Sequence, residues 1–121
     1  MEKKNIIFVA FLSFSLTFTL AFAEHHTAEE RGKAHFNNPA FANGTKPCST
    51  CHPGGKRLEN AGAKTNFTIM GGKQESLEEA VNVCIVNANR GKTIDVKSTE
   101  MQEVVSYIKS LGAKAAPGYG K

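Results

Sequence analysis

Residues 48–52 read Cys48-Ser49-Thr50-Cys51-His52, and this stretch decides more about the chain than any other. Its C-x-x-C-H spacing is the attachment pattern for c-type haem. Two residues between the thiols let one turn of backbone present both sulfur atoms to the two vinyl groups of one porphyrin, where each forms a thioether. The next residue, His52, then projects toward the ring face and can bind iron through an imidazole nitrogen. The stretch predicts one covalent haem c, held by Cys48 and Cys51, with His52 as the proximal iron ligand.

These cysteines have two other possible uses. A structural zinc site would combine Cys48 and Cys51 with the third cysteine, Cys84, and one histidine, but the second C-x-x-C or H-x-x-x-H pair of such sites is missing. A thioredoxin-like redox motif needs a βαβ setting, and the sequence predicts no strand. The export signal, the glycine-rich loop and the small core described below favour haem over both.

The first 23 residues are typical of a secretory signal peptide. Lys3 and Lys4 form a positive start, residues 6–22 are uncharged, and Ala21-Phe22-Ala23 is a small-x-small cleavage site. An uncleaved membrane anchor is the alternative, but the uncharged run is short for a span and contains four Ser and Thr residues. We therefore expect an exported, periplasmic protein that is not attached to the membrane after cleavage.

The mature chain divides into a haem domain, residues 24–112, and a tail, residues 113–121, which we expect to be disordered. The whole chain has 15 Lys and Arg against 11 Asp and Glu, and its basic residues are scattered, so nucleic-acid binding is not expected. The mature part has no Trp and only three Phe, at positions 36, 41 and 67. A domain of this size has a small core, which a large apolar cofactor would complete.

The mature sequence predicts helices and no strand. Capping boxes at Thr27–Glu30 and Ser76–Glu79 mark two helix starts, and a third helix is expected to begin at Ser98 or Thr99 and to end before Gly112. The first helix should end near Pro39, and Gly91 is the expected C-cap of the second. The apolar stripes of the last two helices are Leu77, Ala80, Val81, Cys84, Ile85 and Ala88, and Met101, Val104, Val105, Ile108 and Leu111.

Residues 53–74 form the least regular stretch, with five glycines and few apolar side chains. A stretch of that length without secondary structure is unusual in a compact domain, and we expect it to wrap around the haem.

Over nearly its whole mature length the chain resembles class I-type monohaem cytochromes c. Arg31-Gly32-Lys33, followed by Phe36, is similar to their N-terminal helix, and residues 100–108 are similar to their C-terminal helix. The resemblance implies an all-α, cytochrome c-like fold in which the two helices cross at Gly32 and Tyr107. It also implies one-electron transfer between Fe(III) and Fe(II) with redox partner proteins, another cytochrome among the candidates.

The segment 76–111 is similar to a narrower group, the haem domains of thiosulfate dehydrogenases and related sulfur-oxidising cytochromes. The matching positions are Ser76-Leu77-Glu78, Cys84, Asn89, Gly91-Lys92, Ser98, Glu100-Met101 and Tyr107-Ile108. In those enzymes the helix cysteine is a thiolate ligand of the catalytic haem, which implies Cys84 as the distal iron ligand here. Those enzymes usually have a second haem motif, which this chain lacks, and Asn87 replaces the Arg that tends to follow their ligand cysteine.

Other distal ligands stay open at this point. Met70, 18 residues after His52, is the main rival of Cys84. Met101, Asn87, His35, a vacant position and a partner's side chain are further alternatives. The favoured function is an electron carrier without catalytic residues. The alternatives are the haem subunit of a thiosulfate-type oxidoreductase and a sensor that binds a ligand at a labile distal position.

Overall fold

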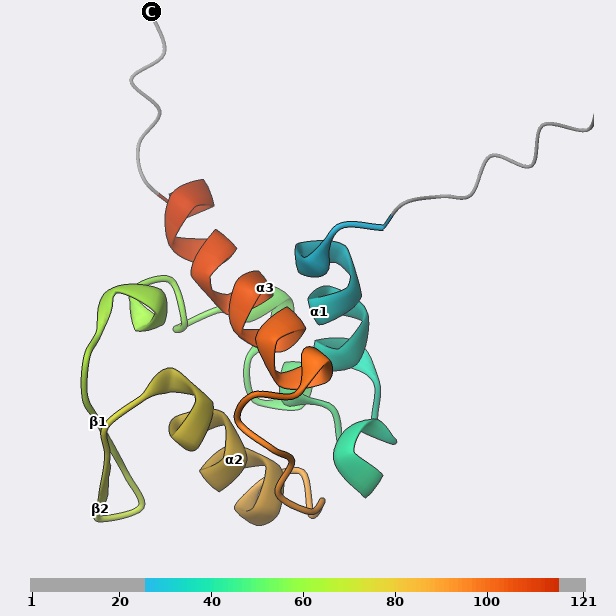
Figure 1. Cartoon of the computed structure of the whole chain (residues 1–121), viewed down its shortest axis with the longest axis vertical. Helices are drawn as coiled ribbons and strands as arrows, with labels where there is room; N and C mark the ends of the chain where they lie inside the picture. The colour runs from blue at the N-terminus through green and yellow to red at the C-terminus, as the bar shows by residue number, and fades with distance from the viewer. Residues whose placement is uncertain (1–25, 116–121) are drawn as a thin grey trace, which may run out of the picture.

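The computed structural model describes residues 26–115, so the predicted signal peptide and residues 116–121 of the predicted tail lie outside it. Three helices make up most of the fold: α1 (Ala28–Asn37), α2 (Leu77–Asn87) and α3 (Thr99–Ala115). A hairpin of β1 (Phe67–Ile69) and β2 (Gly72–Gln74) precedes α2. Short 3-10 turns interrupt the loop after α1, and α1 packs against α3 while α2 and the hairpin lie on the other side of α3 (Figure 1).

The predicted start of α1 is confirmed. The Thr27 hydroxyl accepts a hydrogen bond from the Glu30 amide, and the Glu30 carboxylate accepts one from the Thr27 amide at 2.7 Å. This reciprocal pair satisfies two amides that a helix start would otherwise leave without partners. The helix ends at Asn37, as expected from Pro39, because the residue before a proline disfavours helical backbone.

The crossing of α1 and α3 requires glycine at position 32. A Cβ atom there would lie 1.9 Å from the Glu103 carbonyl oxygen and 3.0 Å from the Tyr107 Cβ. The predicted contact of Gly32 with Tyr107 is therefore present, and the backbone at Glu103 is closer still. One turn along, the rings of Phe36 and Tyr107 meet edge to face at 5.1 Å, in the interior of the core.

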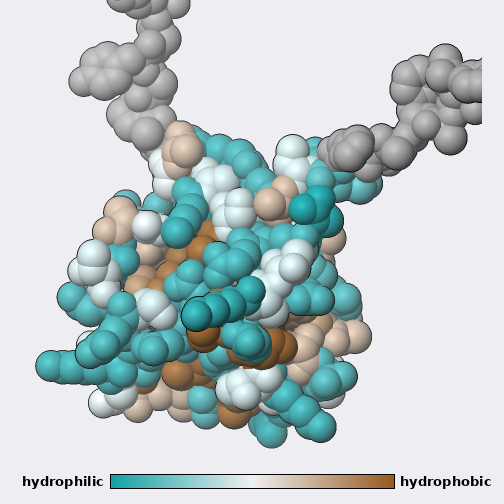
Figure 2. Space-filling view, viewed as in Figure 1, coloured by the Kyte–Doolittle hydropathy of each residue, from teal (hydrophilic) through white to brown (hydrophobic). Residues whose placement is uncertain are grey.

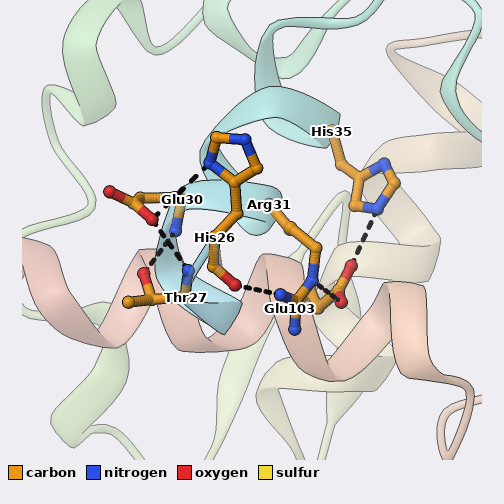
Figure 3. A network of polar contacts seen from close by, with 6 residues as sticks. All are labelled: His26, Thr27, Glu30, Arg31, His35 and Glu103. Carbon is orange, nitrogen blue, oxygen red and sulfur yellow. Dashed lines mark hydrogen bonds and ion pairs between the residues drawn. The ribbon is translucent and has the colours of Figure 1, made fainter. Parts of the chain in front are cut away.

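A polar network closes one side of this crossing (Figure 3). The Glu103 carboxylate is only 8% exposed and accepts hydrogen bonds from Nε of Arg31 and, at 3.0 Å, from Nε2 of His35. The Arg31 guanidinium also donates to the backbone oxygen of His26. Chiefly the hydrogen bond from Arg31 lowers the pKa of Glu103 below the ordinary value of 4.5, against the opposing effect of burial.

We expect Glu103→Gln to reduce the free energy of unfolding at pH 7 by about 1–2 kcal/mol, since it removes a hydrogen-bonded charge from a buried position. Because the folded pKa is lowered, this stabilisation is present above the unfolded pKa and is lost as pH falls through the folded value. Denaturant titration at pH 7 and at about pH 3 should show the difference from the native chain shrinking at the lower pH. Glu100→Gln, exposed on the same helix, is the control, and an equal loss at both pH values would contradict the assignment.

The start of α2 agrees with the prediction only in part. The Ser76 hydroxyl accepts from the Glu79 amide, as expected. The Glu79 carboxylate, however, accepts from the Glu75 amide rather than from Ser76, so the capping box is half formed. The predicted apolar stripe is buried at Leu77, Ala80, Val81 and Ile85, and it includes a half-buried Cys84.

The predicted end of α2 was wrong. The helix stops at Asn87, so Ala88 falls outside it and is exposed. The left-handed residue that turns the chain is Arg90, with φ of 59°, and Gly91 is not the C-cap. Glycine is needed at position 91 for another reason: a Cβ would lie 2.7 Å from the carbonyl oxygen of Ala42, in a loop far away in the sequence.

Two further expectations need correction. The last helix continues through Ala115, past Gly112, so the first residues of the predicted tail are helical. The all-α prediction missed the hairpin, whose two turn residues, Met70 and Gly71, both have positive φ. Strands of three residues are too short to show an alternating pattern in the sequence. A small helical fold with a two-stranded sheet describes residues 26–115.

A candidate haem site between the Cys48 loop and helices α2 and α3

One cavity lies between the loop that follows Cys48, helix α2 and helix α3. Its volume is about 870 Å³ when the part open to solvent is included. Most of the lining is apolar. On the face of the molecule drawn in Figure 2, hydrophobic residues are visible between hydrophilic ones. The lining side chains are Phe36, Cys48, His52, Arg57, Leu58, Asn60, Ala61, Lys64, Phe67, Ile69, Leu77, Ala80, Val81, Cys84, Val104 and Ile108.

The Cys48–His52 stretch forms the short helical turn that was predicted. The amides of Cys51 and His52 donate to the Cys48 carbonyl at 3.3 and 3.1 Å. The side chain of Cys48 reaches the cavity, whereas Cys51 is exposed at its edge. Cys48, Cys51 and Cys84 are not joined by a disulfide.

The His52 imidazole is oriented by a hydrogen bond to the backbone. Its Nδ1 lies 3.0 Å from the carbonyl oxygen of Lys56, which can only accept, so the proton sits on Nδ1. In the neutral tautomer with this proton on Nδ1, Nε2 keeps its lone pair. A histidine that binds a metal typically donates its other ring N–H in this way, which fixes the tautomer and raises the basicity of the ligand nitrogen.

Burial raises the pKa of the Cys48 thiol, while a hydrogen bond from the Asn89 amide side chain, 3.2 Å away, acts in the opposite direction. Burial also raises the pKa of the Cys84 thiol, and the nearby Cys48 and Cys51 raise it further by a smaller amount. An apolar wall therefore keeps the Cys84 sulfur uncharged unless a cation binds it. A thiol that coordinates a metal ion loses its proton.

The five distal ligand candidates separate clearly by position. Only Cys84 lines the cavity. Met70 sits in the hairpin turn with 76% of its surface exposed, and Met101 is fully buried in the core. The Asn87 side chain donates back to the carbonyl oxygen of Val83 on its own helix, and His35 is bound to Glu103.

Three polar side chains of the cavity were missed by sequence reasoning: Arg57, Asn60 and Lys64. Arg57 has a φ of 73° and donates from Nη2 to the Cys51 carbonyl at 2.7 Å, so it braces the motif. All three belong to the irregular stretch, where neither helical nor strand periodicity exists to show which side chains face inward. Only the proximity of His52 in sequence could have drawn attention to Arg57.

The two rival uses of the cysteines do not suit the structure. No group of three or more metal-ligating side chains that could hold a metal ion is present within residues 26–115. The only sheet in this range is an antiparallel hairpin, not a βαβ unit.

None of the helices within residues 26–115 has the length and hydrophobicity needed to cross a membrane.

A comparison with known families shows the family to which the chain belongs. A family model described as SoxA/TsdA, cytochrome c domain matches residues 31–115. The chain belongs to this family. The match to the SoxA/TsdA cytochrome c domain includes α1 and the Cys48 loop, so it extends well beyond the C-terminal segment from which the resemblance was inferred. Neither a curated protein nor a solved structure matches the chain significantly.

Membership of the SoxA/TsdA cytochrome c domain family implies covalently bound haem c, and the residues present fit that group. The donor set contains the His52 imidazole, which is oriented by the Lys56 carbonyl, the Cys84 thiol in the cavity wall, and the Cys48 and Cys51 thiols in C-x-x-C spacing. When bound, haem c supplies one-electron chemistry between Fe(III) and Fe(II). The apolar side chains of α2 and α3 that line the cavity would limit the access of water to a bound haem.

Proposed function

We propose that the protein is an exported, periplasmic electron carrier of the monohaem type, in which Cys48 and Cys51 bind one haem c and His52 and Cys84 hold its iron. The observation that supports this most directly is that Cys84 alone among the distal candidates shares the cavity with His52 and Cys48. Export rests on the predicted signal peptide at residues 1–23. One C-x-x-C-H motif is present in the chain, which agrees with a single haem.

The proposed ligand pair has a chemical consequence. A thiolate donates charge to iron and stabilises the ferric state, so the potential should be low compared with that of a His/Met cytochrome. The residues around Cys84 suit this role, because Val81 and Ala80 on the same helix face give the sulfur an apolar setting. Such a carrier would pass electrons onward to acceptors of higher potential.

A second candidate is the haem subunit of an oxidoreductase for a sulfur compound such as thiosulfate. It is supported by the family match and by Arg57 and Lys64, which add positive charge to the cavity lining where an anion would approach. The single haem motif favours the carrier, since the alternative would need another haem-bearing chain as its electron acceptor.

Anaerobic mixing of the ferric holoprotein with thiosulfate separates the two functions. For the carrier we expect no reduction of the haem absorption within minutes, while a small-molecule reductant reduces it at once. The same test on Arg57→Gln serves as a control for anion binding in the cavity. Rapid reduction by thiosulfate alone, lost in Arg57→Gln, would overturn the carrier and support the oxidoreductase.

The distribution of charge points to the surface that would meet a redox partner. Residues 41–58 and 80–94 contain five basic side chains and no acidic one, and the nine carboxylates within residues 26–115 lie outside these two segments. Three of them, Glu59, Glu79 and Asp95, directly flank the segments, and the charge of Lys56 is among the causes that lower the pKa of Glu59. The two segments are joined at the Cys48 edge of the cavity, where the Thr45 amide donates to the Asn89 carbonyl at 2.9 Å and the Lys92 amide to that of Ala42 at 2.8 Å. We call the basic residues of these two segments the cationic face: Lys46, Lys56, Arg57, Arg90 and Lys92. An acidic protein surface is the partner that fits it.

We expect Lys46→Glu or Lys92→Glu to slow electron exchange with anionic hexacyanoferrate several-fold at low salt, and to speed exchange with cationic hexaammineruthenium. Both effects should vanish above about 0.5 M salt because ions screen exposed charges. Lys33→Glu, an exposed charge reversal on α1, is the control. If that control changes the two rates as much as Lys92→Glu does, the cationic face has no special role.

A further inference from the structure

Asn89 lies directly after α2 and is an unusual residue to find inside this protein. Asn89 is 3% exposed. Within residues 26–115, the buried polar or charged residues are Asn89 and Glu103. A buried amide side chain is unfavourable unless it is hydrogen-bonded. The partners of Asn89 therefore show which parts of the molecule it holds together.

The backbone of Asn89 joins the end of α2 to a distant loop. Its N–H donates to the carbonyl oxygen of Cys84 at 3.1 Å, and its own carbonyl accepts from the amides of Thr45 and Lys46 at 2.9 and 3.4 Å. The Cys84 carbonyl also accepts from Ala88 at 2.8 Å. The last turn of α2, which contains Cys84, is thereby fixed to the chain just before the haem-attachment motif.

The side chain of Asn89 makes a third connection, to the motif itself. Its Nδ2 donates to Sγ of Cys48 at 3.2 Å. A sulfur atom remains a weak acceptor whether it is a thiol or a thioether, so this contact is compatible with haem attachment. The surrounding fit is close, because a Cβ at Gly44 would lie 3.0 Å from the Asn89 carbonyl oxygen.

We propose that Asn89 is a positioning residue that sets the place of Cys84 relative to Cys48. Its side chain contacts the sulfur of Cys48, which is proposed to attach the haem. Its backbone contacts that of Cys84, which is proposed to bind the iron. Asn89 keeps the Cys84 sulfur from moving away from the iron and so slows its replacement by an external ligand. This inference rests on the proposed ligation by Cys84.

The test measures how fast imidazole binds to the ferric holoprotein. Asn89→Asp keeps the size and the backbone bonds of Asn89 but removes the N–H donor to Cys48. We expect the rate constant to rise at least tenfold, with a weaker thiolate signature in the absorption and electron paramagnetic resonance spectra. Asn87→Asp, the same change at an exposed position two residues earlier, should leave both within twofold of the native values.

A purely structural role is tested separately by Glu103→Gln, which destabilises the crossing of α1 and α3 and whose side chain does not line the cavity. It should lower the unfolding temperature without raising the imidazole rate. The positioning role is overturned if Asn89→Asp leaves the rate unchanged or if Glu103→Gln raises it equally. An unchanged ferric spectrum in Cys84→Ser would instead show that the ligand proposal itself is wrong, and the positioning role with it.

Discussion

Replacing Cys84 by serine is expected to abolish the low-spin ferric spectrum of the holoprotein and to raise its reduction potential by on the order of 0.1 V or more, within the span of about 0.8 V that axial ligands cover. The hydroxyl is nearly the size of the thiol, so helix α2 should keep its packing through Val81 and Ile85. The lost interaction is the charge donated by a thiolate to iron, which stabilises the ferric state. Absorption and electron paramagnetic resonance spectra, with a redox titration, measure both quantities.

Met70→Ala is the matched control for this experiment. Met70 lies in the turn of the hairpin and is largely exposed, so its removal should change neither the spectrum nor the potential. If Met70→Ala alters the ferric spectrum and Cys84→Ser does not, the distal ligand is the methionine and the hairpin must fold over the cavity. The assignment of Cys84 would then be abandoned.

The double change Cys48→Ala with Cys51→Ala is expected to remove covalent haem completely, because no thioether can form. The native holoprotein, made with the haem c maturation machinery, should keep essentially all its haem through denaturation and acid–acetone extraction, and the double variant should keep essentially none. Cys48→Ala alone should retain haem through the single thioether at Cys51, with a shifted pyridine haemochrome band. Mass spectrometry of the intact chain gives the same answer independently.

Cys84→Ser is the control for cysteine loss in general, since it should keep covalent haem in full. Extraction of haem from the native chain would rule out attachment at Cys48 and Cys51, and with it the electron-carrier function. Retention in the double variant would place the attachment elsewhere, with Cys84 as the remaining cysteine.

Features that depend on near neighbours in the chain were predictable. The capping box at Thr27 and Glu30 is formed by residues three apart, so the sequence alone was sufficient to place the start of α1. The turn at Cys48 is equally local. The apolar stripe of α2 was correct as far as Ile85, and it failed at Ala88 because the helix ends one residue earlier.

Features that depend on contacts between distant segments were not predictable. Gly91 is the predicted cap of the second helix. The structure instead requires glycine there because the Ala42 carbonyl oxygen lies too close for a side chain. Arg90 makes the turn instead, although arginine rarely adopts positive φ. Glu103 gave no signal in the sequence, because its partners Arg31 and His35 lie about 70 positions away.

The sequence by itself predicted the attachment chemistry of Cys48, Cys51 and His52, because a five-residue spacing can match two vinyl groups and one iron. It named Cys84 only as one of several distal candidates, since periodicity shows that a side chain faces inward but not what it faces. The tertiary structure separated them: packing places Cys84 on the cavity wall and Met70 at an exposed turn. It also revealed Asn89, whose bonds to Cys48 and Thr45 exist only after the two loops have met.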